Sequence, residues 1–195
     1  MQFIFTGKLT QNKTMKKKSI ISTLATAFIL LISLSSTAQD FAKMDKSPMD
    51  GAAFPSSYKE SNKLIKIVYS RPQLKGRALE KLAPNGKVWR TGANEAAELT
   101  LYTPMTLGGT KIAPGTYTFY VIPGDKEWTA IINTDLNVWG SYFYKEDNDV
   151  ARITVPVTTA EESLEAFGIA FKESTDGVHM HLGWDKVRVA IPFVK

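Results

Sequence analysis

From Lys63 onward the chain carries short runs in which apolar and polar residues alternate. Successive side chains of a β-strand point to opposite faces, so this pattern predicts half-buried strands. Turn signals such as Asn85-Gly86 and Thr175-Asp176-Gly177 separate the runs. The strands expected before the last segment cover residues 63–70, 98–103, 116–122, 128–133, 152–158 and 164–172.

The last segment changes its hydrophobic phase halfway along. Its apolar residues occupy even positions first and odd positions afterwards: Val178, Met180, Leu182 and Trp184, then Val187, Val189, Ile191 and Phe193. One uninterrupted strand cannot bury both sets on the same side. We therefore expect a β-bulge or a tight turn at Asp185-Lys186, or a strand that passes from one sheet to another.

Helical periodicity is nearly absent after residue 38. One helical turn at 161–166 and a short helix within 72–82 are the exceptions. Without helices to cover a sheet, the sheet must cover itself. The pattern predicts a single all-β domain over 63–195, an antiparallel β-sandwich of jelly-roll-like type, with a β-barrel as the alternative. Residues 39–62 are polar and small, without sustained periodicity, and indicate a loose N-terminal segment.

The first 38 residues have the features of a leader. Three lysines at 16–18 precede an uncharged run at 20–34, and small residues at 36–38 precede Gln39. This is the pattern of a secretory signal peptide. The run is shorter than the roughly 20 residues that a membrane-spanning helix needs. We expect translation to start at Met15, cleavage after residue 38 and a periplasmic or extracellular protein; an uncleaved anchor is the alternative.

Removing the leader changes the charge of the protein. The whole chain has 24 basic and 19 acidic residues, but the leader holds five lysines and no acid, so 19 of each remain. A chain without net charge gives no electrostatic sign of a nucleic-acid partner or of membrane binding after cleavage. The chain has no Cys, which excludes disulfides, thiolate catalysis and an acylated cysteine anchor.

The only two histidines, His179 and His181, are spaced H-x-H. On a strand this spacing puts both imidazoles on one face, as some metal sites require. The neighbouring apolar residues indicate that the opposite face of the strand packs against the core. No other residue stands at a spacing that predicts a third metal ligand. We therefore predict an exposed pair, with no metal and no cofactor.

A cluster of aromatic residues followed by acids occupies residues 137–149. Its members are Trp139, Tyr142, Phe143, Tyr144, Glu146, Asp147 and Asp149. Aromatic rings beside carboxylates can stack a sugar ring and accept hydrogen bonds from its hydroxyls. In the alternative interpretation, Trp139 and one tyrosine close the end of the sandwich while the acids cover a solvated loop.

The stretch K-V-W-R-T-G-A-N-E-A, residues 87–96, is a second candidate site. Arg90 offers a planar fork for a carboxylate or phosphate, while Asn94 and Glu95 can orient a ligand. The same residues also allow a purely structural interpretation, in which Arg90 pairs with Glu95 and Trp89 packs inside. Arg71, at the end of the first predicted strand, could extend such a site.

Several stretches, taken in order, resemble a secreted bacterial family known as domain of unknown function 2911. They are Y-S-R-P-Q-L-K-G-R, G-K-V-W-R-T-G-A-N-E-A, P-G-T-Y-T-F-Y-V-I-P-G with E-W-T-A-I-I-N, V-W-G-S-Y-F-Y and W-D-K-V-R-V-A-I-P. The resemblance covers most of 63–194 and implies a secreted β-rich domain, but no activity. The positions that it marks are Ser70, Arg71, Pro72, Gly76, Arg77, Trp89, Arg90, Gly92, Asn94, Glu95, Trp139, Gly140 and Tyr142.

Three functions are compatible with these patterns. The first is a non-catalytic module that binds a polar small molecule, anionic or saccharide. Its ligand-binding residues would be Arg71, Arg90, Asn94, Glu95, Trp139 and Tyr142. The second is a glycosidase-like hydrolase that pairs Glu95 with Asp147 or Asp149. The third is a structural or interaction protein without a small-molecule site. The oligomeric state does not follow from the sequence.

Overall fold

The computed structural model describes residues 39–195, so the predicted leader lies outside the described residues. All elements below belong to the unit of residues 44–195. The strands are β1 (Met49–Phe54), β2 (Ile65–Ser70), β3 (Ala97–Leu101), β4 (Met105–Leu107), β5 (Thr110–Ile112), β6 (Gly115–Ile122), β7 (Glu127–Asn133), β8 (Asp149–Ser174) and β9 (Gly177–Val194). Two 3-10 turns, η1 (Leu79–Lys81) and η2 (Glu146–Asn148), are the helical elements of the described part. It contains no helix long and apolar enough to cross a membrane.

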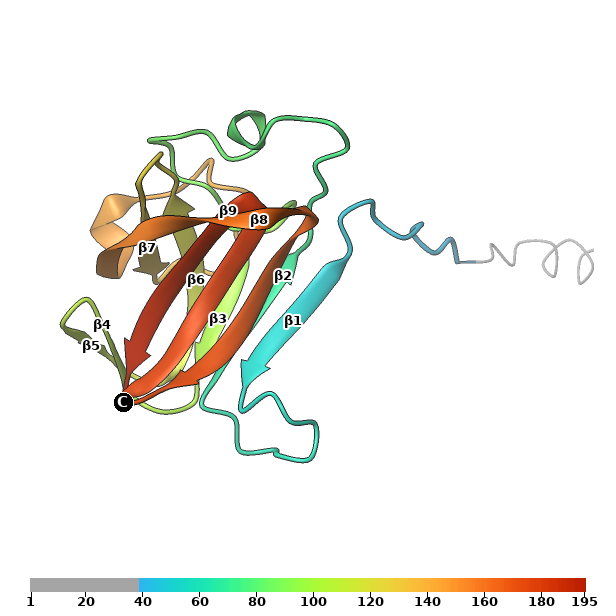
Figure 1. The fold of residues 1–195 in the computed structure, drawn as a ribbon. Helices are drawn as coiled ribbons and strands as arrows, with labels where there is room; N and C mark the ends of the chain where they lie inside the picture. The colour runs from blue at the N-terminus through green and yellow to red at the C-terminus, as the bar shows by residue number, and fades with distance from the viewer. Residues whose placement is uncertain (1–38) are drawn as a thin grey trace, which may run out of the picture. The chain divides into compact units, whose positions relative to one another are not determined.

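The strands pair antiparallel in the order β1-β2-β3-β6-β7-β8-β9-β4-β5. β8 takes part in two layers, since its first residues pair with β7 and its last residues pair with β9. Figure 1 shows β8 and β9 in front of β2, β3 and β6. The order of the described strands begins at β1 and ends at β5 without closing, which favours the sandwich over the barrel. The predicted all-β, antiparallel, sandwich-like fold is confirmed.

An aromatic cluster lies at the centre of the core between the layers. Trp89 stacks on Trp184, with ring centroids 5.5 Å apart and planes 19° apart. Phe167 and Trp128 meet Trp89 edge-on, at centroid distances of 5.0 and 6.2 Å. Trp89 also pairs its backbone with Val121 through hydrogen bonds of 2.7 and 3.0 Å. The prediction that Trp89 packs inside is therefore confirmed.

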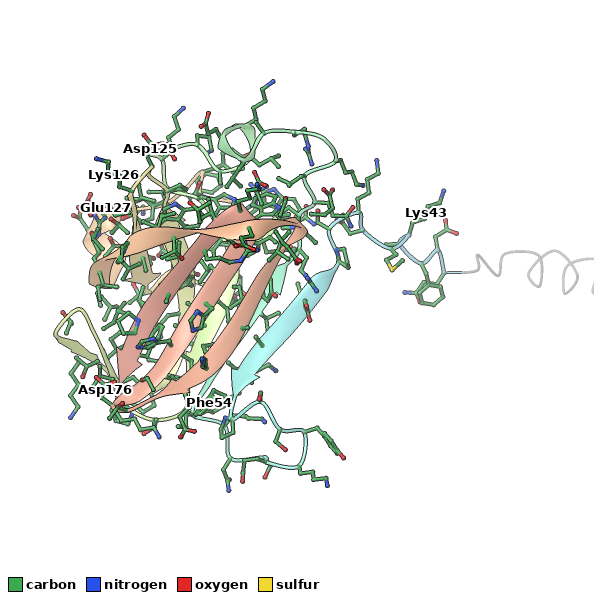
Figure 2. The ribbon with its side chains drawn as sticks, in the orientation of Figure 1. Lys43, Phe54, Asp125, Lys126, Glu127 and Asp176 are labelled. Carbon is green, nitrogen blue, oxygen red and sulfur yellow. The ribbon has the colours of Figure 1, made fainter. Side chains whose placement is uncertain are left out.

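The phase change in the last segment has a structural cause at Asp185. The amide of Lys195 donates to the carbonyl of Asp176 at 3.0 Å, so the two ends of β9 lie side by side. A straight strand of this length would separate its ends by roughly 55 Å. Figure 1 shows the two red lengths of β9 next to each other, and Figure 2 places Asp176 at the end where the C-terminus lies. The chain doubles back at Asp185, where φ is +47°, so the predicted turn is confirmed.

Three elements differ from the sequence-based expectation. β1 lies inside the segment expected to be loose; it pairs only with β2 and is half exposed, so it carries no strong apolar alternation. β8 runs through the expected helical turn at 161–166, where its pairing with β9 shifts register between Thr159 and Gly168. The hairpin of β4 and β5 was not predicted, because its strands have three residues each and show too little periodicity.

Candidate functional site

A cavity of about 470 Å³ lies on the outer face of β2 and β3. Ile67 and Leu99 are fully buried in the core, so their strand neighbours Val68 and Glu98 point to the opposite face. We call this the outer cavity. Its lining residues are Met49, Val68, Tyr69, Ser70, Glu95, Ala96, Glu98, Asn137 and Trp139.

The wall of the outer cavity is a short pairing between two loops. The amide of Ala96 donates to the carbonyl of Val138, and the amide of Gly140 donates to the carbonyl of Asn94, each at 3.0 Å. These bonds place Trp139 directly opposite Glu95. The Trp139 side chain is left 55% exposed, at the edge of the cavity.

A second carboxylate, that of Glu98, lines the same cavity. The amide of Asn137 donates to Glu98 Oε1 at 3.2 Å, which ties the loop that carries Trp139 to β3. Among the described residues, the ion pairs involve Asp50, Glu146 and Asp149 as acids, and neither Glu95 nor Glu98. Both carboxylates in the cavity are therefore without a cationic partner there.

A small second core supports this loop from below. Tyr120, Ile131 and Ala96 are buried on the outer face of the sheet, and Val138 and Tyr144 pack against them. The rings of Tyr120 and Tyr144 meet edge-on at 5.3 Å. The outer cavity therefore stands on a packed base, which keeps the loop in place when no ligand is bound.

Asp149 is the polar anchor of the same loop. Its carboxylate accepts hydrogen bonds from Asn133 Nδ2 at 2.8 Å, Tyr144 OH at 2.7 Å and Arg152 Nε at 2.6 Å. Its side chain is only 8% exposed. Burial, the hydrogen bond to Asp149 and the charge of Asp149 raise the pKa of Tyr144. A carboxylate held in this way is poorly suited to acid–base catalysis, and Asp147 does not line the outer cavity. The hydrolase alternative therefore gains no support.

The buried tyrosine beneath the loop gives a prediction for alkaline stability. Burial, with smaller effects from the charges of Asp135 and Asp149, raises the pKa of Tyr120 to about 12. A tyrosine in an unfolded chain titrates near 10. The folded form therefore keeps a proton that the unfolded form loses, and stability falls as pH rises from about 10 to about 12. We expect the urea midpoint to fall in this window by the equivalent of about 1–2 kcal/mol for Tyr120.

Tyr120→Phe provides the control for this pH dependence. The phenylalanine keeps the packing against Ala96 and Ile131 but has no proton to lose. The urea midpoint of the variant should fall less steeply between pH 10 and pH 12 than that of the wild type. Parallel curves for the two proteins would contradict the assignment to Tyr120.

Arg90 follows neither of the two interpretations made from the sequence. The ion pairs of the described residues do not include Arg90 with Glu95, and Glu95 is exposed. Arg90 does not line the outer cavity, and its Nε is buried without a hydrogen-bond partner. Its Nη1 lies 3.6 Å from the position of a Cβ on Gly140, under the loop that carries Trp139.

Gly92, the small residue of the same motif, is required by close packing. A Cβ on Gly92 would lie 3.0 Å from the carbonyl oxygen of Ser70. The loop therefore approaches the end of β2 more closely than a larger residue would allow. Thr91, just before it, is fully buried and has φ of +52°. This stretch is held tightly and positions Asn94 and Glu95 against the Trp139 loop.

The structure brings together only part of the predicted site. Glu95 and Trp139 share the outer cavity, and Asn94 supports it through its backbone. Arg71 lies away from it: its Nε donates to the carbonyl of Phe167 at 2.9 Å, and its Nη1 lies 3.2 Å from Asp50 Oδ2. Tyr142 is 76% exposed and does not line the outer cavity.

Sequence reasoning missed four residues of the outer cavity that could contact a ligand. They are Met49, Ser70, Glu98 and Asn137. Ser70 belongs to a marked motif, and Glu98 is the polar member of an alternating run, so the sequence contained an indication for both residues. The sequence gives no signal for Met49, because residues 39–62 lack the periodicity that would predict β1. It gives none for Asn137, because the turn there depends on a φ of +56°.

The histidine pair lies on the outer face of β9. The imidazole centroids of His179 and His181 are 6.2 Å apart. Burial, together with the nearby His179 and Lys172, lowers the pKa of His181. No group of three potential ligands stands close enough to hold a metal ion within residues 39–195.

The comparisons with known proteins identify a family and give no activity. A family model described as "Protein of unknown function (DUF2911)" matches residues 53–193. This range contains every residue of the outer cavity except Met49. No curated protein and no solved structure matches the chain.

Proposed function

Since this chain belongs to the DUF2911 family, which is described as one of unknown function, we propose from the outer cavity that it is a binding protein for a small saccharide. The observation that carries the proposal is the exposed Trp139 indole, held opposite Glu95 on the edge of a 470 Å³ cavity. Cavities of about 300–1,000 Å³ accommodate small ligands. A flat indole stacks on the apolar face of a sugar ring, while nearby carboxylates accept hydrogen bonds from its hydroxyls.

The charge of the cavity narrows the class of sugar. Glu95 and Glu98 line it, and none of its lining residues is Lys, Arg or His. An acidic sugar would place its carboxylate beside two others, at a cost in binding energy. An amino sugar would place its ammonium group beside the two carboxylates, with the indole face available for a cation–π contact. We therefore expect affinity to decrease from amino sugars through neutral sugars to uronic acids.

Trp139→Ala tests the proposal directly. Calorimetric titration of the wild type with glucosamine, N-acetylglucosamine, glucose and glucuronate should show binding of at least one of the first three. Loss of stacking should weaken that binding roughly 5- to 150-fold in Trp139→Ala, in line with a contribution of about 1–3 kcal/mol. Because the side chain is 55% exposed, the melting temperature should change little.

Phe143→Ala is the matched control. Phe143 is an aromatic residue of the same loop, 73% exposed, and it does not line the outer cavity. Its replacement should leave affinity within about twofold of the wild type. Glucuronate as the tightest ligand, equal losses in the two variants, or no binding by any of the four sugars would overturn the proposal.

We further propose that the protein is exported. The support is the pattern of residues 1–38, with a basic end, an uncharged run and small residues before Gln39. Mass spectrometry of the protein from the periplasm or the medium should give a mature chain that begins at Gln39. A full-length chain retained in the cytoplasm would contradict export.

A further inference from the structure

A second cavity, of about 390 Å³, lies on the outer face of the layer formed by β8 and β9. We call it the arginine cavity. Its lining includes Asp50, Arg71, Gly168, His181, Gly183 and Arg188. Tyr69 lines both cavities, but the residues that carry charge differ.

The floor of the arginine cavity is a pair of glycines. Gly168 of β8 and Gly183 of β9 stand directly opposite each other in the antiparallel register. Their neighbours Ile169 and Leu182 are buried in the core, so the glycines face outward. The absence of side chains at this pair leaves room above the sheet, which the side chains of Leu164 and Arg188 partly fill over Gly183.

Two arginines reach over this glycine pair from opposite sides. A Cβ on Gly168 would lie 3.7 Å from Arg71 Nη2. A Cβ on Gly183 would lie 2.9 Å from Leu164 Cδ1, 3.3 Å from Arg188 Cδ and 3.5 Å from Arg188 Nε. Because Gly168 and Gly183 are directly opposed, with Cβ positions roughly 4.5–5.5 Å apart, both guanidinium groups border the same part of the sheet surface.

Backbone carbonyls hold the fork of each arginine in place. Arg71 Nε donates to the carbonyl of Phe167, and Arg188 Nη2 donates to that of Glu162, each at 2.9 Å. Arg188 Nη1 donates to the carbonyls of Asp185 and Val187, each at 2.8 Å. Because the acceptors are neutral carbonyls, these contacts add no negative charge to the cavity.

The remaining donors and the charge balance point to an anion. Arg71 Nη1 forms an ion pair with Asp50 Oδ2 at 3.2 Å. The donors that face the glycine pair are therefore Arg71 Nη2 and Arg188 Nε. The two guanidinium groups are compensated by one lining carboxylate, that of Asp50. An anion placed between two guanidinium groups would offset their mutual repulsion.

We propose that the arginine cavity binds the oxyanion group of a small ligand, a carboxylate or a phosphate, between Arg71 Nη2 and Arg188 Nε. Each arginine offers one N–H group that is already oriented, and hydrogen bonds between guanidinium groups and an oxyanion are charge-assisted and strong. His181 forms part of the wall, and its Nε2 is buried without a partner. This site is separate from the outer cavity and does not depend on the saccharide proposal.

The test follows the imidazole signals of the two histidines by NMR while inorganic phosphate or acetate is added at constant ionic strength. His181 lines the arginine cavity, whereas His179 lies on the same strand face outside it and serves as the internal control. The signal of His181 should shift and saturate with at least one of the two anions, while that of His179 moves much less. The anion that saturates at lower concentration identifies the ligand group. Equal shifts of both histidines, or no saturation with either anion, would overturn the proposal.

Gly168→Val should abolish the effect without harming the fold. Its side chain would occupy the place of the anion, and β-branched residues are favourable in strands. Gly168→Ala, whose Cβ would make only an ordinary contact with Arg71, should still fold and weaken anion binding at least fivefold. Lys126→Gln removes an exposed positive charge that does not line the cavity and should leave binding within about twofold. The proposal would be contradicted if folded Gly168→Ala bound the anion as tightly as the wild type. It would also be contradicted if Lys126→Gln lost anion binding.

Discussion

Replacement of Asp149 by alanine is expected to lower the free energy of unfolding by about 1–3 kcal/mol, the usual cost of leaving buried hydrogen-bond donors without their acceptor. The carboxylate of Asp149 accepts from Asn133, Tyr144 and Arg152. Without it, Asn133 Nδ2 loses a partner in a residue that is fully buried. Urea unfolding, followed by circular dichroism, measures the change.

Asp147→Ala is the control for this prediction. It removes a carboxylate two residues away that is exposed and joins none of these bonds, and its effect should stay within about 0.5 kcal/mol. Since the loop carries Trp139, Asp149→Ala should also weaken saccharide binding. Equal destabilisation by the two variants would contradict the role of Asp149 as the anchor.

Gly177→Ala is expected to destabilise the fold by about 2–3 kcal/mol, as overpacking does elsewhere. A Cβ on Gly177 would overlap the carbonyl oxygen of Phe193 and lie 3.0 Å from its carbonyl carbon. Both atoms belong to the backbone of the returning length of β9, which cannot move aside without breaking its pairing. Thermal and urea unfolding should both register the loss.

Gly51→Ala is the matched control in another strand. Its Cβ would lie 3.5 Å from the carbonyl oxygen of Ile67, an ordinary contact. Because alanine restricts the unfolded chain, this change should be neutral or slightly stabilising. If Gly177→Ala proved as harmless as Gly51→Ala, the doubling back of β9 would be in doubt.

The sequence predicted the strands of the core well, because their side chains alternate between a buried and an exposed face. It also placed the turn at Asp185, since two apolar sets of opposite phase cannot share one straight strand. It did not predict β1, a half-exposed edge strand, or the path of β8 between two layers. Both depend on pairings with residues distant in the chain, which leave little local pattern.

The candidate site was predicted only in part, for a similar reason. Glu95 and Trp139 were named from their motifs, and they meet in the outer cavity. The direction of the two arginines could not be read from spacing: Arg90 lies under the loop, and Arg71 turns toward β8. A motif identifies residues that matter, but the face of the sheet that each one serves is set by tertiary contacts.

The central claim is that the outer cavity binds a saccharide against Trp139, and the indole N–H signals of the protein test it most directly. The chain has four tryptophans, of which Trp89, Trp128 and Trp184 are buried and only Trp139 is exposed. In a titration with glucosamine, observed by ¹H–¹⁵N correlation NMR, the Trp139 signal, assigned from its loss in Trp139→Phe, should move and saturate while the other three stay in place. A Trp139 signal that does not move, at sugar concentrations where calorimetry records binding, would contradict the claim.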